Sequence, residues 1–174
     1  MTGTGDGDKA DLTRLVLEHM EDALRLATRL CGDVHRGEDV MQEALYRAAR
    51  GWKSFRGESH FRTWLFRIVV NAFRDSLRRR EDHVALPAEI PACGTDHVAE
   101  AEVREVEAIV ADSISALPPR QKEVVILRIV EELPASEVAR ILEMTEANVH
   151  ATVYAARQRL KRKLAPYLDQ VPRE

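Results

Sequence analysis

Apolar residues recur at helical spacing through the first half of this 174-residue chain, and this pattern limits the fold more than any other feature. From Asp11 to Cys31 the spacings are three and four residues, which is typical of one stripe of an amphipathic helix. The stripe consists of Leu12, Leu15, Val16, Met20, Leu24, Ala27 and Leu30. Cys31-Gly32-Asp33 is expected to end this helix, because glycine is favoured just after a helix C-terminus. No alternating strand pattern appears along the chain.

The same periodicity organises the rest of the sequence. A second helix is expected from about Gly37 to Arg50, followed by a loop over 54–60 and a long helix from Phe61. Residues 82–99 contain two prolines and a glycine and predict a flexible linker. Helices resume near Glu100. The prediction is an all-α protein with two small helical domains, residues 10–81 and 100–170, joined by the linker 82–99.

A run of interleaved aromatic and basic residues begins at Phe55. From Lys53 to Arg80 there are eight Lys and Arg against two acids, although the whole chain has a net charge of −3. Basic groups attract phosphates, and exposed aromatic faces stack on unpaired bases, so the run suits opened nucleic acid. The alternative is a solvated helix whose Phe61, Trp64 and Leu65 face a core, and both interpretations can hold together.

The second half contains a candidate helix-turn-helix. Residues 136–142 form a short expected helix, Glu143-Met144-Thr145 a tight turn, and Glu146 to Leu164 a second helix that Thr145 can cap. The second helix is expected to bury Val149, Val153, Ala156 and Leu160, leaving another face for DNA. That face is expected to offer His150, Ala151, Tyr154, Arg157 and Lys161. A plain helical hairpin is the alternative.

Composition narrows the classes of function. No apolar stretch is long enough to span a bilayer and the N-terminus lacks a signal-peptide core, so we expect a cytoplasmic protein without membrane insertion. No phosphate-binding loop, nucleophile elbow or paired metal motif appears, so no enzyme activity, catalytic residue or cofactor is expected. Cys93 and His97, with His83 nearby, allow a zinc or redox site, but three scattered ligands in a linker favour no metal.

Three segments together resemble the extracytoplasmic-function (ECF) sigma factors, the small promoter-specificity subunits of bacterial RNA polymerase. Residues 37–43 (Gly-Glu-Asp-Val-Met-Gln-Glu) resemble an acidic signature of sigma region 2. Residues 55–71 are similar to the segment that melts and reads the minus-ten element. Residues 117–125 and 136–142 resemble the opening of region 4, which reads the minus-thirty-five element. The resemblance covers about Leu12 to Leu168 and implies a region 2 helical bundle and a region 4 helix-turn-helix.

The resemblance assigns roles to particular residues. It implies docking on a coiled coil of the largest polymerase subunit through Glu38, Asp39, Gln42 and Glu43. For minus-ten DNA it implies a base pocket at Asn71 with the 54–60 loop, and the candidate contacts are Arg56, Ser59, Arg67, Asn71, Arg74, Arg78 and Arg79. For minus-thirty-five DNA the candidates are Thr145, Asn148, His150, Ala151, Tyr154, Arg157 and Lys161. The implied partners are core RNA polymerase, promoter DNA and an anti-sigma factor.

The recognition helix departs from the family pattern. Two customary arginines are replaced by His150 and Thr152, and Ala155 stands where a basic residue is frequent. The glycine of the preceding turn is Glu143, so a different turn is possible. Two other functions remain open at this point: a regulator that binds duplex DNA without polymerase, and a protein-binding helical adaptor. The aromatic-basic loop argues against the first, and the basic recognition helix argues against the second.

Overall fold

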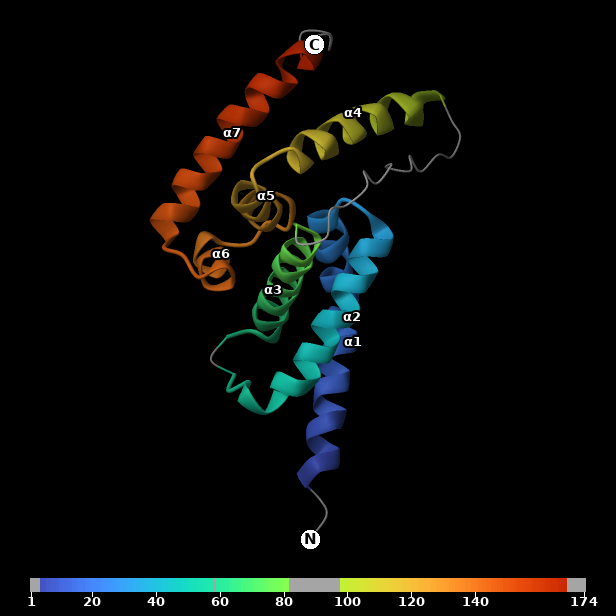
Figure 1. The fold of residues 1–174 in the computed structure, drawn as a ribbon, viewed down its shortest axis with the longest axis vertical. Helices are drawn as coiled ribbons and strands as arrows, with labels where there is room; N and C mark the ends of the chain where they lie inside the picture. Colours follow the sequence, from blue (N-terminus) through green and yellow to red (C-terminus); the bar gives the residue numbers. More distant parts are fainter. Residues whose placement is uncertain (1–3, 58, 82–97, 169–174) are drawn as a thin grey trace. The chain divides into compact units, whose positions relative to one another are not determined.

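The computed structural model describes residues 4–57, 59–81 and 98–168, and it divides the chain into two units (Figure 1). Every regular element of the described residues is helical, which confirms the all-α prediction. The first unit contains α1 (Thr4–Cys31), α2 (Val34–Gly51), the short 3-10 helix η1 (Trp52–Ser54) and α3 (Phe61–Glu81). The second contains α4 (Val98–Ser115), α5 (Pro119–Val125), the π-helix η2 (Ile126–Val130), most of α6 (Ala135–Leu142) and α7 (Glu146–Leu168).

The first unit is a bundle in which α1, α2 and α3 each pack against the other two (Figure 1). Its core is formed by the apolar stripes of the three helices. The buried side chains include Leu26 and Leu30 from α1, Val40, Met41 and Ala44 from α2, and Leu65, Phe66, Val69 and Val70 from α3. Burial of these side chains provides the main driving force for packing the bundle.

The connection between α1 and α2 is short and tightly defined. Gly32 ends α1 with a φ of 69°, a left-handed conformation that glycine adopts without steric cost, as the sequence predicted. Asp33 then caps α2, because its Oδ1 accepts a hydrogen bond of 2.8 Å from the Arg36 backbone N–H. The cap explains why α2 begins at Val34, earlier than the apolar pattern indicated. α1 likewise begins at Thr4, before the start of the apolar stripe near Asp11.

Gly37 brings α1 and α2 into close approach. A Cβ atom at this position would lie 2.7 Å from the Cα of Thr28 and 2.6 Å from its Oγ1. Both distances are shorter than van der Waals contact, and the Cα cannot rotate away. Only glycine therefore fits this helix crossing without moving the backbone.

The aromatic residues around the 54–60 loop pack on one another. The ring centroids of Phe55 and Trp64 are 5.2 Å apart, those of Phe61 and Trp64 are 5.4 Å apart, and Trp52 contacts all three rings. Phe61 and Phe66 are buried. Burial of Phe61, together with that of Leu65, confirms the interpretation in which these side chains face a core.

The second unit contains the helix-turn-helix expected from the sequence. Glu143 forms the turn between α6 and α7 with a φ of 54°, so it adopts the backbone conformation that a glycine would otherwise supply. The Thr145 hydroxyl then caps α7, accepting a 3.2 Å hydrogen bond from the Asn148 backbone N–H. Val149 and Ala156 are fully buried. Ala156 lies in a core with Leu117 and Val125, against which Ile114 and Leu160 pack.

Candidate polymerase and nucleic-acid interfaces

The four residues expected to dock on polymerase lie on α2 within two turns. Glu38, Asp39 and Gln42 are exposed, whereas Glu43 is partly buried. Positions three and four residues apart share a helix face, so Asp39, Gln42 and Glu43 are neighbours on the surface. Glu38 lies on the edge of this face, with one carboxylate oxygen 3.6 Å from His35 Nδ1. The arrangement presents carboxylates to a partner with basic side chains.

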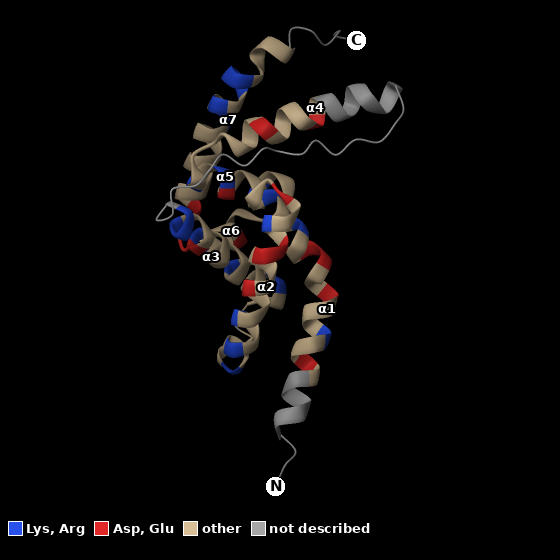
Figure 2. Ribbon diagram, turned by 45° about the vertical axis from the view of Figure 1, so that its right-hand side comes forward, with Lys and Arg blue, Asp and Glu red and all other residues tan. Residues whose placement is uncertain are grey.

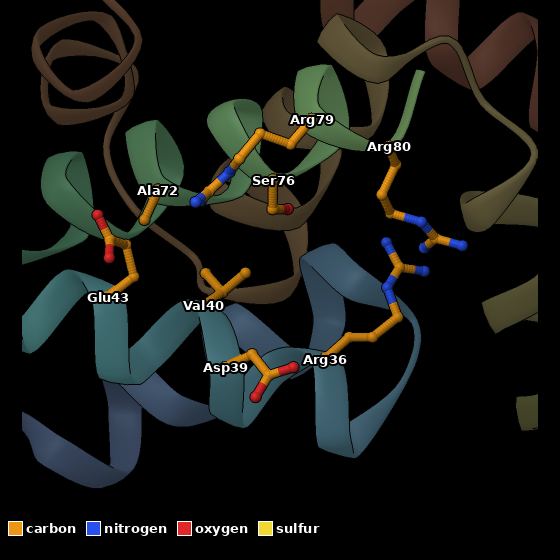
Figure 3. A pocket seen from close by; sticks show the side chains of 8 residues that line it. All are labelled: Arg36, Asp39, Val40, Glu43, Ala72, Ser76, Arg79 and Arg80. Carbon is orange, nitrogen blue, oxygen red and sulfur yellow. The ribbon is translucent and has the colours of Figure 1, made fainter. Parts of the chain in front are cut away.

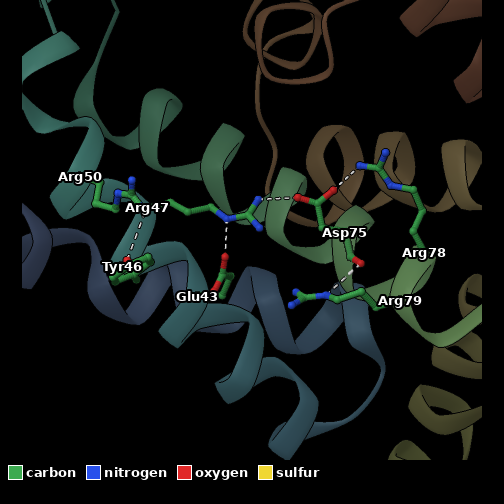
Figure 4. Close-up of polar contacts among 7 residues, drawn as sticks. All are labelled: Glu43, Tyr46, Arg47, Arg50, Asp75, Arg78 and Arg79. Carbon is green, nitrogen blue, oxygen red and sulfur yellow. Dashed lines mark hydrogen bonds and ion pairs between the residues drawn. The ribbon is translucent and has the colours of Figure 1, made fainter. Parts of the chain in front are cut away.

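Glu43 also belongs to a chain of ion pairs that joins α2 to α3 (Figure 4). Arg47 donates to Glu43 Oε1 at 2.7 Å and to Asp75 Oδ2 at 2.6 Å. Asp75 also pairs with Arg78. The Arg47 guanidinium, followed by Arg78, holds the pKa of Asp75 below its usual range. Hydrogen bonds to Asp75 and Glu43 in turn raise the pKa of Arg47.

Arg47 was not among the residues that the sequence singled out. Its spacing of four residues from Glu43 was a readable signal for the local pair. The pairing with Asp75, 28 residues further along the chain, depends on how α2 packs against α3. Sequence spacing carries no information about that contact.

The candidate DNA residues of α3 divide between two sides of the helix. At about 100° per residue, Arg67, Asn71, Arg74 and Arg78 fall on one stripe. Asn71 and Arg74 are partly buried and Arg67 and Arg78 are exposed, so the stripe can be reached from solvent. Arg79 lies about a quarter turn away from Arg78, and the two side chains leave α3 in different directions (Figure 4).

The loop before α3 carries the other two candidate minus-ten residues. Arg56 is exposed and Ser59 is partly buried. Gly57, between them, has a φ of 70°, which most other residues would adopt only with strain. Two hydrogen bonds hold the start of the loop against η1. Ser54 Oγ donates to the Gly51 carbonyl at 2.7 Å, and the Phe55 N–H donates to the Trp52 carbonyl at 3.0 Å. Because these bonds fix the start of the loop, Arg56 lies on the surface near the aromatic cluster.

A hollow of about 230 Å³ lies between α2 and α3 (Figure 3). It brings together arginines and carboxylates that are far apart in the sequence. Its lining consists of Arg36, Asp39, Val40 and Glu43 from α2 and Ala72, Ser76, Arg79 and Arg80 from α3. The hollow therefore includes part of the acidic docking face and the one candidate DNA residue, Arg79, that lies off the α3 stripe.

In the second unit, all seven candidate minus-thirty-five residues are exposed on α7 or at its cap. They occupy two flanks of the helix. His150, Tyr154, Arg157 and Lys161 form one stripe, while Thr145 and Asn148 lie toward the other flank. The Thr145 hydroxyl is occupied by its capping bond. Basic residues recur along the ribbon of α7, and acidic residues mark α4 (Figure 2).

His150 and Arg157 also line an open hollow of about 440 Å³ with Arg128 and Glu132. Arg128, on η2, was not identified from the sequence. It adds a cation beside the recognition helix, where two customary arginines are missing. Two arginines and a histidine therefore line this hollow, with one carboxylate.

The described residues hold no cluster of three or more His, Cys, Asp or Glu side chains that could bind a metal ion. The zinc or redox site considered for Cys93, His97 and His83 lies outside the described residues. Cys31 is buried in the first unit. Among the described helices, none is long and apolar enough to cross a membrane.

Comparison with known proteins identifies both units. The family model for Sigma-70 region 2 matches residues 15–82, and the model for Sigma-70, region 4 matches residues 107–160. The RNA polymerase sigma-H factor of Pseudomonas aeruginosa is 31% identical over 176 residues, covering 94% of this chain and 91% of that protein. The ECF RNA polymerase sigma-E factor of Haemophilus influenzae is 33% identical over 177 residues, covering 93% and 92%.

Solved structures share the fold. The sigma factor RpoE of Bartonella quintana, crystallised with the anti-sigma factor NepR, matches with a TM-score of 0.74 at 23% identity, covering 89% of this chain and 97% of that chain. CnrH, solved with the cytosolic domain of CnrY, matches with a TM-score of 0.66 at 25% identity, covering 92% of each chain. Together, the two family models in this order and relatives that match along nearly their whole length show that this chain belongs to the ECF RNA polymerase sigma factors, non-enzymatic subunits that bind core RNA polymerase and direct it to promoters.

Proposed function

We propose that this sigma factor docks on core RNA polymerase through the exposed face of α2 formed by Glu38, Asp39, Gln42 and Glu43. The supporting observation is that Asp39 and Gln42 are exposed, adjacent on one helix face and not held by any ion pair among the described residues. An exposed carboxylate such as Asp39 loses little favourable free energy when a basic side chain of the partner replaces the water around it. Glu43 supports the face from its edge, since its carboxylate is already shared with Arg47.

Promoter DNA is proposed to contact both units. In the first, the surface comprises the α3 stripe and the preceding loop, with Arg56, Ser59, Arg67, Asn71, Arg74 and Arg78. The Asn71 amide can donate to and accept from the edge of an unstacked base, while the arginines neutralise phosphates. Arg79 faces the hollow on the other side of α3 and is left out of this surface.

In the second unit, α7 is proposed to enter the major groove of the minus-thirty-five element. Exposure of His150, Tyr154, Arg157 and Lys161 along one stripe supports this role, with Ala151, Thr145 and Asn148 on the adjoining surfaces. With His150 and Thr152 in place of arginines, phosphate attraction should be weaker than the family pattern provides. Arg128 beside His150 offsets part of that loss.

The domain limits of this proposal are region 2 at 10–81, a linker at 82–99 and region 4 at 100–170. Since core polymerase and promoter DNA share one compartment in bacteria, the site of action is the cytoplasm. Expression of 10–81 alone should yield a folded domain that binds core polymerase, and insoluble or non-binding material would contradict these limits.

An anti-sigma factor is the proposed restraint on activity. The Bartonella quintana relative in fold was crystallised with the anti-sigma factor NepR, and CnrH with the cytosolic domain of CnrY. Such a partner would bury the loop-to-helix surface around Arg62 and the region 4 surface near Tyr154. Phe61 and Val125, which the sequence suggested for these two surfaces, are buried and cannot contribute to them. Co-purification from unstressed native cells should recover a stoichiometric companion protein, and recovery of the chain only free or on polymerase would reject sequestration.

Run-off transcription with purified core polymerase tests the central proposal. The chain should convert core enzyme to promoter-specific initiation, and Asp39→Arg should weaken core binding while leaving circular dichroism unchanged. Asp11→Arg, the same charge reversal at an exposed residue of α1, is the matched control and should bind core normally. Equal core affinity of Asp39→Arg and the parent chain would remove α2 as the docking face.

A further inference from the structure

Two guanidinium groups from different helices face each other across the α2–α3 hollow. Arg36 extends from α2 and Arg80 from α3, and the two side chains point toward one another (Figure 3). Arg79 lines the same hollow. Like charges that converge repel each other unless an anion lies between them. Both Arg36 and Arg80 are partly buried, so water screens that repulsion less than it would on an open surface.

The described residues supply no such anion. No carboxylate among them forms an ion pair with Arg36, Arg79 or Arg80. The polar contacts that these arginine side chains make are two long hydrogen bonds of 3.4 Å, from Arg36 to the Cys31 carbonyl and from Arg79 to the Asp75 carbonyl. The nearby carboxylates Glu43 and Asp75 are committed to Arg47. Asp39 also lines the hollow but forms no ion pair with its arginines.

The hollow also contains carboxylates of the docking face, and this combination restricts what can bind there. Asp39 and Glu43 line its α2 side, across from Arg79 and Arg80 on α3. A nucleic-acid backbone carries only negative charge and would meet these carboxylates unfavourably. A protein helix can carry both signs, placing a basic side chain beside Asp39 and an acidic one among the arginines.

We infer that the Arg36–Arg79–Arg80 hollow receives an acidic side chain of the coiled coil of the largest polymerase subunit when α2 binds core enzyme. This inference rests on the proposed docking through α2 and gives that interface a second, oppositely charged half. A carboxylate can accept paired hydrogen bonds from a guanidinium, so arginine suits this role better than lysine. Mixed charges also fix the register of the partner helices, which a purely acidic face would not.

The experiment compares charge variants of the full chain in equilibrium binding to purified core RNA polymerase. Arg36→Glu/Arg80→Glu should weaken core affinity at least about tenfold, as expected for loss of an interfacial charge pair. Arg36→Lys/Arg80→Lys should keep part of the affinity, since the charge remains while the paired geometry is lost. Arg14→Glu on α1 reverses one exposed arginine away from the hollow, with half the charge change of the double variant, and should keep the parental affinity. Thermal unfolding checks that each variant is folded.

A compensating change on the polymerase makes the test specific. Acidic residues of the polymerase coiled coil are replaced by lysine one at a time, and one such replacement should restore binding of the Arg36→Glu/Arg80→Glu chain. If the Arg36→Glu/Arg80→Glu chain binds core polymerase with parental affinity, the inference is overturned. It is also overturned if no lysine replacement on the polymerase restores binding.

Two further results distinguish a contact with polymerase from a contact with promoter DNA and from failure of the docking face. If the variant binds core normally but the resulting holoenzyme binds promoter DNA more weakly, the arginines contact a DNA phosphate and the inference is wrong. If Asp39→Arg also fails to weaken core binding, the proposed docking face itself fails. If Asp39→Arg weakens core binding but Arg36→Glu/Arg80→Glu does not, the inference is overturned while the proposed docking face stands.

Discussion

Arg47 of α2 and Asp75 of α3 form a 2.6 Å ion pair that joins the helix proposed to dock on polymerase to the helix proposed to hold minus-ten DNA. Each side chain has a second partner on its own helix, Glu43 for Arg47 and Arg78 for Asp75. The pair therefore connects one residue of each proposed interface through the bundle (Figure 4). It restrains how α2 and α3 can rotate against each other.

The Arg47–Asp75 pair should make a measurable contribution to stability. Both side chains are 31% exposed, so a value between those of surface and buried pairs is expected, about 1 kcal/mol of coupling free energy. Urea unfolding of the parent, Arg47→Met, Asp75→Asn and the double variant gives this energy from a double-mutant cycle. A coupling energy indistinguishable from zero would mean that the contact does not join the helices energetically.

The same pair predicts a pH dependence. Arg47 lowers the pKa of Asp75 in the folded state, so the associated stability is present above the unfolded pKa of about 3.9 and is lost as the pH falls through the lower folded value. The stability difference between the parent and Asp75→Asn should be constant from about pH 7 to 5 and should shrink below about pH 4. Urea unfolding at several pH values measures it, and a difference that grows toward low pH would have the wrong sign.

Gly37→Ala should destabilise the first unit. The added Cβ would lie 2.7 Å from Thr28 Cα, so the crossing of α1 and α2 must widen at a cost of about 1–3 kcal/mol. Gly51→Ala is the matched control, because its Cβ would meet Trp64 at 3.7 Å, an ordinary contact. The control should be neutral or stabilising by up to about 1 kcal/mol, since alanine favours helix. Chemical unfolding measures the stability of both variants. Equal free energies of unfolding would contradict the close approach of α1 and α2 at Gly37.

Asn71→Ala should impair promoter opening more than initial duplex binding. If the amide holds an unstacked base, its loss should cost about 1–3 kcal/mol, roughly ten- to hundredfold in the population of open complex. Permanganate reactivity of unpaired thymines measures opening, and filter binding to duplex promoter serves as the control measurement. Unchanged reactivity would remove Asn71 from the base pocket, and a uniform loss of duplex binding would make it structural.

His150→Arg should strengthen binding to minus-thirty-five duplex DNA. An arginine there adds one phosphate contact, so the slope of log affinity against log salt should become steeper by about 0.9. Ala108→Arg, at an exposed site on α4, adds the same charge away from the recognition stripe and should change the slope less. Fluorescence anisotropy over a salt series makes the measurement. Equal slopes for the two variants would show that His150 lies outside the DNA interface.

The sequence alone determined most of the local structure. The Gly32 helix end, the Thr145 cap and the buried positions Val149 and Ala156 were all predicted and are confirmed. These features depend on residues within one or two turns of each other, and helix periodicity and capping chemistry can be read at that range. The order of the region 2 and region 4 motifs likewise identified the family before any geometry was available.

Tertiary structure decided which side chains meet across helices. The Arg47–Asp75 pair, the approach of Gly37 to Thr28 and the convergence of Arg36 with Arg80 each join different helices. Arg78 and Arg79 lie on different sides of α3, and this difference matters only because α2 packs against one of those sides. Periodicity indicates which face of a helix is apolar, but the rotation and crossing of packed helices follow from how all their side chains interlock. The sequence therefore identified the docking and DNA-binding helices, while packing produced the mixed-charge hollow between them.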